Sequence, residues 1–314
     1  MKRRDFQRLT AALLCGFRAF GHVIEMFDYP WRLGIITDQV DMDLGNVLGE
    51  FYSKYRLGLA EIRYLKLGGS NQYVYANATP AQLRQVRRQL DDAGVKVSVL
   101  DTAIYKIALP GTKPVGELPA YVSGGDARCE RQMEDLKRAA DAAHAVGTDR
   151  IRIFTFRRVA DPNGIFDRVV ENLQMAIGVA RQQEVTLLVE NEYDCNTATG
   201  QEIARLFRAI PDRRLMHNWD PCNCYEMDEE PFPNVWNQLD YSRISHIHLK
   251  DAMGKEWKPI GAGAINFTGQ FQALKSLNYS GTLSLETRYR DTQQDAYTSS
   301  VESMNGLIRI LKRV

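Results

Sequence analysis

The sequence predicts a single-domain (β/α)8 barrel, the TIM-barrel class of α/β fold, and three observations support this prediction. After residue 32, short β-branched runs alternate steadily with amphipathic stretches, a pattern typical of buried strands followed by helices. Strict alternation implies a parallel sheet, because parallel neighbours need a crossover connection. Eight such units follow one another without a linker, and eight units close into a barrel. The alternative, an open doubly wound sheet, is disfavoured because no G-x-G-x-x-G follows the first strand.

Each expected strand is a short apolar run, which suits strands buried on both faces. In chain order these runs are 33–40, 60–67, 95–104, 149–156, 186–192, 214–220, 244–251 and 281–289. The helices expected to follow them are 48–55, 79–94, 129–146, 165–183, 200–210, 235–239, 267–277 and 296–312. The helix over 79–94 has the most complete signature, with Thr79 as N-cap, Pro80 in the first turn and Gly94 as the stop. The helix near 235–239 has the weakest pattern.

One connection is much longer than the others. Residues 105–128 separate the third strand from its helix and contain Pro110, Pro114, Pro119 and four glycines. Loops of this length without structure of their own are usually lids or binding loops. Because the βα loops of a barrel lie at its catalytic end, we expect this segment near the active site.

The N-terminal region, residues 1–30, is predicted to be an extension that precedes a barrel spanning 31–314. It begins M-K-R-R-D-F and continues with a short apolar stretch, which resembles a twin-arginine export signal. Gln7 stands where an apolar residue is usual, and Arg18 interrupts the apolar stretch. The sequence favours export to the periplasm. The alternative is a cytoplasmic protein with an amphipathic N-terminal helix.

Composition excludes several classes of protein. The chain has 40 Lys and Arg against 39 Asp and Glu, a net charge of +1, whereas nucleic-acid binding needs a basic excess. No apolar run reaches the roughly 18–20 residues of a membrane span. Hydrophobic residues make up 44% of the chain, which is ordinary for a globular protein. Five cysteines without regular spacing indicate free thiols rather than a disulfide scaffold.

Four residues that commonly bind metals fall on four consecutive expected strands. Glu190, Asp220 and Glu286 close the fifth, sixth and eighth strands, and His248 lies in the seventh. Active sites of barrels are assembled at these C-terminal strand ends. Three carboxylates at one place repel one another unless a cation is present. We therefore expect one divalent ion, with Mn²⁺ as the first choice and Mg²⁺, Co²⁺ or Zn²⁺ as alternatives.

The same strands carry longer motifs. These are V-E-N after the fifth strand, W-D-P-C-N after the sixth, H-I-H-L-K-D on the seventh, P-I-G-A-G-A-I-N-F after it and S-L-E on the eighth. As a set they resemble the xylose-isomerase-like sugar phosphate isomerase/epimerase family over about residues 33–314. The resemblance implies a barrel with one divalent ion held by Glu, Asp, His and Glu, which correspond here to Glu190, Asp220, His248 and Glu286.

Apurinic endonucleases belong to the same superfamily and are an alternative that the resemblance raises. Those enzymes bind further zinc ions through additional histidines. In this chain Asn223 stands where they have the first of these, and no histidine lies between His22 and His144. A site with three zinc ions is therefore not expected, and the near-neutral charge agrees with this.

The expected site suits chemistry at a carbon next to a carbonyl. Four protein ligands leave two positions on the ion, which a sugar carbonyl and its neighbouring hydroxyl can fill, and an enediolate is then stabilised. Glu190 and Glu286 come from non-adjacent strands. We expect one of them to remove a proton and the other to return it, in addition to holding the metal. Return to the opposite face gives epimerisation, and return to the neighbouring carbon gives isomerisation.

Two cations are expected to contact the substrate. Lys250 and Arg288 lie two residues beyond His248 and Glu286, so they share the facing of those ligands but sit nearer the mouth. Either could hold a phosphate, a carboxylate or a sugar hydroxyl.

Three further substrate contacts are expected near the same strand ends. Glu192 and Asn223 are placed to form hydrogen bonds, and Trp257 could stack on a sugar ring. His246 lies two residues before His248, one layer deeper, where a supporting role is favoured over metal ligation.

The sequence therefore predicts a metal-dependent sugar isomerase or epimerase that acts on a ketose or related keto-sugar through an enediolate. The alternative is a metal-dependent lyase or dehydratase acting on an inosose or a 3-keto-glycoside. An apurinic endonuclease-like enzyme and a non-catalytic sugar-binding barrel are less favoured. The expected partner is a small-molecule sugar and not a nucleic acid, and the chain is compatible with a homo-oligomer.

Overall fold

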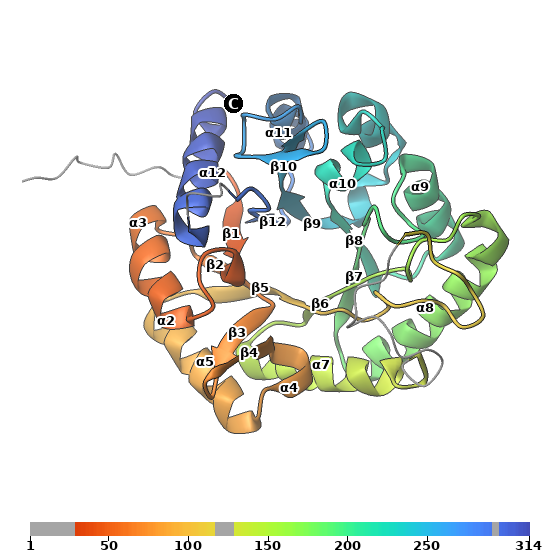
Figure 1. Cartoon of the computed structure of the whole chain (residues 1–314), viewed down its shortest axis with the longest axis horizontal. Coiled ribbons are helices and arrows are strands. Elements are labelled where there is room, and N and C mark those ends of the chain that lie inside the picture. The colour runs from red at the N-terminus through yellow and green to blue at the C-terminus, as the bar shows by residue number, and fades with distance from the viewer. Residues whose placement is uncertain (1–28, 117–128, 291–294) are drawn as a thin grey trace, which may run out of the picture. The chain divides into compact units, whose positions relative to one another are not determined.

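The computed structural model describes residues 29–116, 129–290 and 295–314, and these form a closed parallel barrel surrounded by helices (Figure 1). The barrel strands are β1 (Arg32–Ile36), β2 (Leu59–Ile62), β5 (Lys96–Asp101), β6 (Arg150–Ile153), β7 (Thr186–Glu190), β8 (Leu215–Trp219), β9 (Ile244–Leu249) and β12 (Thr282–Leu285). Around the barrel the order is β1-β12-β9-β8-β7-β6-β5-β2, so strands that follow one another in the chain are neighbours. The predicted (β/α)8 barrel is confirmed.

Helices cover the outside of the barrel (Figure 1). The longer ones are α5 (Pro80–Asp92), α7 (Gln132–Val146), α8 (Phe166–Gln182), α9 (Gly200–Ala209), α11 (Phe267–Ser276) and α12 (Ala296–Leu311). The helix expected at 48–55 is part of a longer run made of α2 (Leu44–Asn46), η2 (Val47–Tyr52) and α3 (Ser53–Tyr55). Shorter elements include η1 (Thr37–Gln39), α4 (Val74–Asn77), η4 (Asn163–Ile165) and α10 (Pro221–Tyr225).

Local signals explain where the helices begin and end. Thr79 and Gln82 form a capping box at the start of α5, as the expected N-cap requires, and Thr199 and Glu202 form a second one at α9. These side chains satisfy backbone N–H groups that have no partner within the helix. Helix α7 ends at Gly147, whose φ of 93° is a conformation that glycine adopts without steric cost.

The barrel strands are generally shorter than the runs expected from the sequence, and after two of them the chain leaves the barrel as an antiparallel hairpin. The run 60–67 breaks at Arg63, after which β3 (Tyr64–Leu67) pairs with β4 (Ser70–Tyr73). The turn contains Gly68 and Gly69, with φ values of 60° and 89°. The apolar content of the run 60–67 did not indicate that the residues after Arg63 pair with β4 instead of with a barrel strand.

The seventh strand ends in a similar way. Strand β9 stops at Leu249, and Asp251 opens a hairpin of β10 (Asp251–Met253) and β11 (Glu256–Lys258). The Asp251 carboxylate accepts hydrogen bonds from the backbone N–H groups of Gly261 and Gly263 at 2.8 and 3.1 Å. A Cβ at Gly263 would lie 2.1 Å from Asp251 Oδ1. Asp251 of the H-L-K-D motif and the glycines of the G-x-G motif are therefore joined by hydrogen bonds that hold one loop together, and this contact is called the loop anchor below.

The helix expected near 235–239 is replaced by short helical turns. These are η5 (Pro231–Val235), η6 (Trp236–Gln238) and η7 (Tyr241–Arg243). Two prolines in P-F-P lack the N–H groups that a regular helix needs. Trp236 stacks on Tyr241, with ring centroids 4.8 Å apart, which fixes the turns against one another.

The interior of the barrel is charged where the site lies. Glu61, Asp101, Arg152, His246 and His248 are all buried, and they come from four different strands. Buried charges are tolerated only when they are paired. Arg152 Nη1 lies 3.2 Å from Asp101 Oδ2, and Glu61 contacts both histidines.

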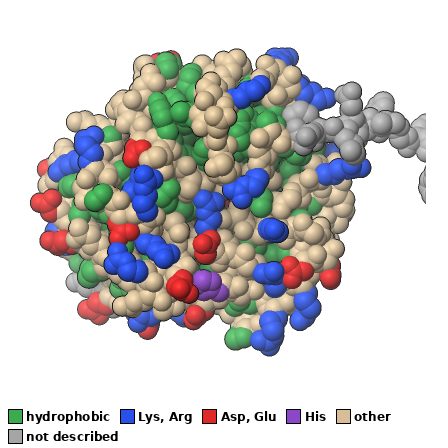
Figure 2. All heavy atoms as spheres, turned by 180° about the vertical axis from the view of Figure 1, so that it is seen from behind, with side chains coloured by type: hydrophobic (Ala, Val, Ile, Leu, Met, Phe, Trp, Pro, Cys, Tyr) green, Lys and Arg blue, Asp and Glu red, His purple; other side chains and the backbone are tan. Residues whose placement is uncertain are grey.

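The face opposite the view of Figure 1 carries acidic and basic side chains close together (Figure 2). This mixture agrees with the net charge of +1. Within the described residues, every helix is too short or too polar to cross a bilayer. The expected export signal lies outside the described residues, as do positions 117–128 of the long loop. Cys195, Cys222 and Cys224 are buried free thiols.

Candidate metal centre and the cavity beside it

The structure brings the four residues expected at strand ends into one buried cluster, referred to below as the four-residue cluster. Glu190 ends β7, Asp220 follows β8, His248 lies in β9 and Glu286 follows β12, and these strands are neighbours in the barrel. One ligand atom from each residue lies within 4.8 Å of the others. Three carboxylates and one imidazole at this spacing fit a divalent ion.

The orientation of Asp220 is set by helix α10. Its Oδ1 accepts hydrogen bonds from the backbone N–H groups of Cys222 at 2.9 Å and Asn223 at 3.1 Å. Its Oδ2 faces the cluster, 2.8 Å from Lys250 Nζ. Burial raises the pKa of Asp220 to about 6. Oδ1 thus fixes the orientation of the side chain, and Oδ2 points into the four-residue cluster.

His248 is held from behind by Glu61, a residue that the sequence reasoning missed. Glu61 Oε1 lies 2.9 Å from His248 Nε2, and Glu61 Oε2 lies 2.9 Å from His246 Nε2. The Nδ1 atom of His248 faces the cluster, 3.2 Å from Glu190 Oε1 and 3.6 Å from Glu286 Oε2. A carboxylate on the far nitrogen of a ligating histidine fixes its tautomer. His246 contacts the other oxygen of the same carboxylate, and its supporting role remains a prediction.

Glu61, His246 and His248 also lie close enough together to suggest a second metal position. However, the Glu61 oxygens contact the imidazole nitrogens directly at hydrogen-bond distance. We therefore interpret this group as a hydrogen-bonded support.

Burial lowers the pKa of His248, but the carboxylates of Glu61 and Glu190 more than offset this and hold that pKa well above its ordinary value.

Each glutamate of the cluster has a cationic partner. Arg152 Nη1 lies 3.1 Å from Glu190 Oε2, and Lys250 Nζ lies 3.1 Å from Glu286 Oε2. Burial raises the pKa of Glu190, but Arg152 and His248 outweigh it and lower that pKa to about 2. Lys250 and His248 likewise hold the pKa of Glu286 well below its usual value, against the effect of burial. Both side chains are thus ionised at neutral pH, as metal ligands must be.

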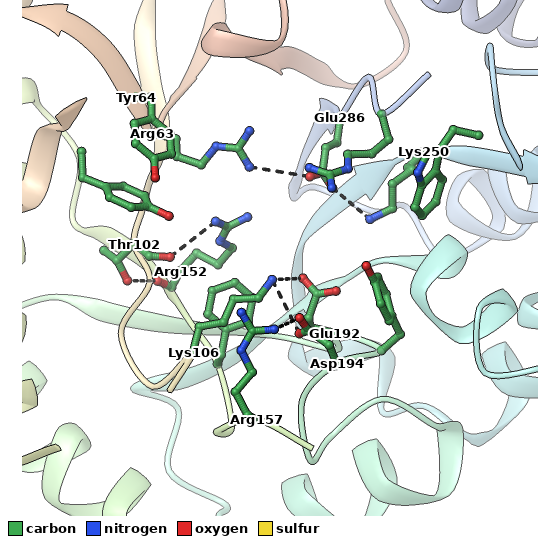
Figure 3. Close-up of a pocket in the computed structure, with 15 residues that line it drawn as sticks. Arg63, Tyr64, Thr102, Lys106, Arg152, Arg157, Glu192, Asp194, Lys250 and Glu286 are labelled. Carbon is green, nitrogen blue, oxygen red and sulfur yellow. Dashed lines mark hydrogen bonds and ion pairs between the residues drawn. The ribbon is translucent and has the colours of Figure 1, made fainter. Parts of the chain in front are cut away.

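A cavity of about 350 Å³ opens beside the cluster, and Figure 3 shows the labelled side chains around it. This volume is at the lower end of the range for small-molecule sites. The lining is charged and aromatic, and consists of Arg63, Tyr64, Tyr73, Thr102, Lys106, Arg152, Phe154, Arg157, Glu192, Tyr193, Asp194, Lys250, Trp257, Glu286 and Arg288. Glu286 belongs to both the four-residue cluster and the lining of the cavity, so the cluster and the cavity form one continuous site.

Four of the five residues expected to contact substrate line this cavity, namely Glu192, Lys250, Trp257 and Arg288. Asn223 lies deeper, where its Nδ2 donates to Glu190 Oε1 at 3.3 Å and its Oδ1 accepts from Lys250 Nζ at 3.1 Å. The Trp257 ring is flanked by cations, with Lys250 Nζ 5.6 Å and the Arg288 guanidinium 6.0 Å from its centroid.

Several cavity residues had no place in the sequence prediction. Glu61, which contacts His248 and does not line the cavity, did carry a signal, since an acid within a strand expected to be buried on both faces must find a partner. Arg63 lay within the run 60–67 expected to be a strand and was not singled out, and Lys106 and Arg157 carried no signal because single basic residues after strands are common. Tyr64 reaches the cavity only because the chain turns into the β3–β4 hairpin after Arg63.

Comparison with known proteins agrees with the fold. Residues 60–307 match the sequence model of the xylose isomerase-like TIM barrel family, and the chain belongs to that family. No curated protein sequence matches the chain closely enough to count as a relative. The class defined by the fold and the family match is thus a xylose isomerase-like (β/α)8 barrel.

Solved structures resemble the chain in fold at low sequence identity. One is the IolI protein with a bound zinc atom, with a TM-score of 0.70 and 13% identity over 90% of this chain and 98% of the other. Another is L-ribulose 3-epimerase, with a TM-score of 0.63 and 15% identity over 90% of this chain and 95% of the other. A third is a fusion of a xylose isomerase-like barrel with 4-hydroxyphenylpyruvate dioxygenase, with a TM-score of 0.67 and 16% identity over 89% of this chain. The chain spans 42% of that fusion protein.

Proposed function

We propose that the protein is a divalent-metal-dependent sugar isomerase or epimerase that acts on a ketose or related keto-sugar through an enediolate. The observation that carries this proposal is the four-residue cluster, in which two glutamates flank a shared centre beside a cavity of small-molecule size. Neighbouring folds include an epimerase of a ketose, which supports the same class of chemistry.

In this proposal Glu190, Asp220, His248 and Glu286 hold the ion, and we expect Mn²⁺. The ion would polarise the substrate carbonyl and lower the pKa of the neighbouring C–H. Glu190 and Glu286 stand on strands separated by β8 and β9, so they approach a substrate from two sides. One carboxylate takes the proton and the other returns it.

The remaining site residues orient the substrate in this proposal. The Lys250 ammonium lies within hydrogen-bond distance of Asn223 Oδ1 and Glu286 Oε2. From this place it can donate to an oxygen that gains negative charge as the proton leaves. Glu192 and Arg288 hold hydroxyl groups further from the ion, and Trp257 covers one side of the sugar.

The test combines metal analysis with proton exchange. The purified protein is analysed for bound metal and then incubated with ketoses, inososes and 3-keto-glycosides in deuterated water. Incorporation of deuterium with inversion at one carbon supports an epimerase, and transfer of the carbonyl supports an isomerase. Release of water or an aglycone would instead support the lyase alternative. A protein that holds no metal and exchanges no proton would contradict both.

The matching variant is Glu286→Gln. It keeps the size of the side chain but removes a proton acceptor and a charged ligand, so we expect deuterium incorporation to fall below detection. Asp91→Asn serves as the control, because Asp91 pairs with Arg87 on the exposed side of α5. Retained exchange in Glu286→Gln would rule out the proposed acid/base role of this glutamate.

A further inference from the structure

A second cavity, of about 410 Å³, lies at the end of the barrel where the strands begin, and it is called the basal pocket below. Five of its lining residues are the first residues of β1, β2, β5, β6 and β12, namely Arg32, Leu59, Lys96, Arg150 and Thr282. The end of α7 and the loop after it complete the lining. The four-residue cluster lies at the opposite ends of these parallel strands. The proposed proton transfer therefore leaves the basal pocket without a role.

The guanidinium group of Arg150 is held in a fixed position beside this pocket. Its Nη1 atom donates to Thr282 Oγ1 at 3.1 Å, and its Nη2 atom donates to the backbone carbonyl of Ser245 at 2.9 Å. Both acceptors are neutral, and the two bonds use only part of the five N–H groups of a guanidinium. Arg150 is half-buried, so a held cation with donors to spare borders the cavity.

Arg150 differs from the other inward-facing arginine of its strand. Arg152 lies two residues further along β6 and is paired with two carboxylates. Among the described residues, no carboxylate lies within ion-pair distance of Arg150. Burial lowers the pKa of Arg150, and Tyr279 and Asp149 offset this only in part. A half-buried charge without a counter-ion is unfavourable, so a ligand that supplies negative charge here would relieve that cost.

Two more cations border the same cavity. Arg32 Nη2 donates to the backbone carbonyl of Ser280 at 2.8 Å, which is again a neutral acceptor, and Lys96 is exposed. Within the part of the chain that the structure describes, neither forms an ion pair. The acidic side chain of the lining is Asp149. With three cations against one carboxylate, the pocket carries an excess of two positive charges when His144 is neutral.

We propose that the basal pocket binds the phosphate group of a small molecule, with Arg150 as its anchor and Arg32 and Lys96 as further contacts. A phosphate monoester carries a charge of about −1.5 to −2 at pH 7, which matches the excess of the pocket. The paired N–H groups of a guanidinium also fit the oxygens of a phosphate. Leu59 and Val97 give the pocket an apolar side, where the organic part of a monoester can lie. This proposal does not depend on the proposed function.

The experiment locates binding by the chemical shifts of backbone amides. Protein loaded with Mg²⁺ is titrated with inorganic phosphate, with glycerol 3-phosphate and with glycerol. We expect saturable shifts at residues 147–149, which line the pocket, with both phosphates and none with glycerol. Affinity should fall as NaCl is added, because partly exposed charges are screened. Tighter binding of glycerol 3-phosphate would identify an organic phosphate as the ligand, and equal or tighter binding of inorganic phosphate would identify free phosphate.

Variants test the named cations. Arg150→Gln removes the anchor, so the affinity for glycerol 3-phosphate should fall by about tenfold or more. Lys96→Gln removes an exposed charge, for which a loss of about two- to fivefold is expected, and it decides the question if Arg150→Gln fails to fold. Lys66→Gln is the matched control, since Lys66 is an exposed lysine of β3 outside the lining. Arg288→Gln removes a cation of the other cavity. Both controls should leave the affinity unchanged.

Three outcomes would overturn the proposal. The first is the absence of saturable shifts at residues 147–149 with both phosphates, and the second is an equal response to glycerol. The third is unchanged affinity in the folded variants at Arg150 and Lys96, or a loss of affinity in Arg288→Gln instead. Deuterium exchange on keto-sugars is measured separately, so failure of the proposed enzymatic function and failure of this site would be told apart.

Discussion

Replacement of Glu61 by Gln should weaken metal binding although Glu61 lies outside the four-residue cluster. Both Glu61 oxygens serve as acceptors, each 2.9 Å from an Nε2 atom of His246 or His248. Glutamine has one oxygen and one amide NH₂, so one imidazole must lose its acceptor. If His248 loses its acceptor, the ring proton can move from Nε2 to Nδ1, the atom that faces the cluster. The loss of such a support typically costs about 10–100-fold in metal affinity, or roughly 1.4–2.8 kcal/mol.

The assay is a competition titration of Mn²⁺ or Co²⁺ against a chelator of known affinity, on protein shown to be folded by circular dichroism. Thr282→Val is the matched control, because Thr282 Oγ1 contacts the imidazole of His246, at 2.6 Å from Nδ1, rather than that of His248. It should lower stability while metal affinity changes by less than about twofold. Unchanged affinity in folded Glu61→Gln, or an equal loss in Thr282→Val, would refute the reasoning.

Two other predictions concern protons and the loop anchor. Metal binding should release about one proton at pH 7. Burial lowers the pKa of His248, but Glu61 and Glu190 outweigh this effect and hold that pKa well above its usual value. The ion needs the deprotonated ring, so the proton must leave when the metal binds. Calorimetric enthalpies should therefore vary with the ionisation enthalpy of the buffer, and a constant enthalpy would contradict this. Asp251→Ala should lower the free energy of unfolding in urea by about 2–3 kcal/mol, since Gly261 and Gly263 lose a charged acceptor. It should also speed amide hydrogen exchange at both glycines, and slow exchange there would argue against the anchor.

The sequence was sufficient to predict the barrel because its signals are local. Strands such as β7 and β8 are short apolar runs, and caps such as Thr79 mark helix starts within a few residues. The cluster could be anticipated for the same reason, since the end of each strand lies at a known edge of a barrel. The metal-binding and catalytic roles of its members remain predictions.

The remainder of the site depends on contacts between distant parts of the chain. Glu61 meets His248 across 187 positions of sequence and Lys106 meets Glu192 across 86, and no local pattern encodes such pairs. The two hairpins were missed because Tyr64 and Asp251 continue runs that look like barrel strands. Which residues pair with a strand of the main sheet depends on the closed barrel as a whole and not on the local sequence.

Under the proposed function, the two hairpins separate the residues expected to select the substrate from those expected to carry out the chemistry. The four-residue cluster rests on the strands and the first residues after them, whereas β3–β4 and β10–β11 carry Tyr64, Tyr73 and Trp257 to the cavity wall. The two ends of each hairpin lie side by side, since Tyr64 pairs with Tyr73 and Asp251 with Lys258, so residues within a hairpin can be exchanged while the strand ends keep their register. Libraries restricted to these two hairpins should therefore alter substrate preference and leave the four-residue cluster unchanged.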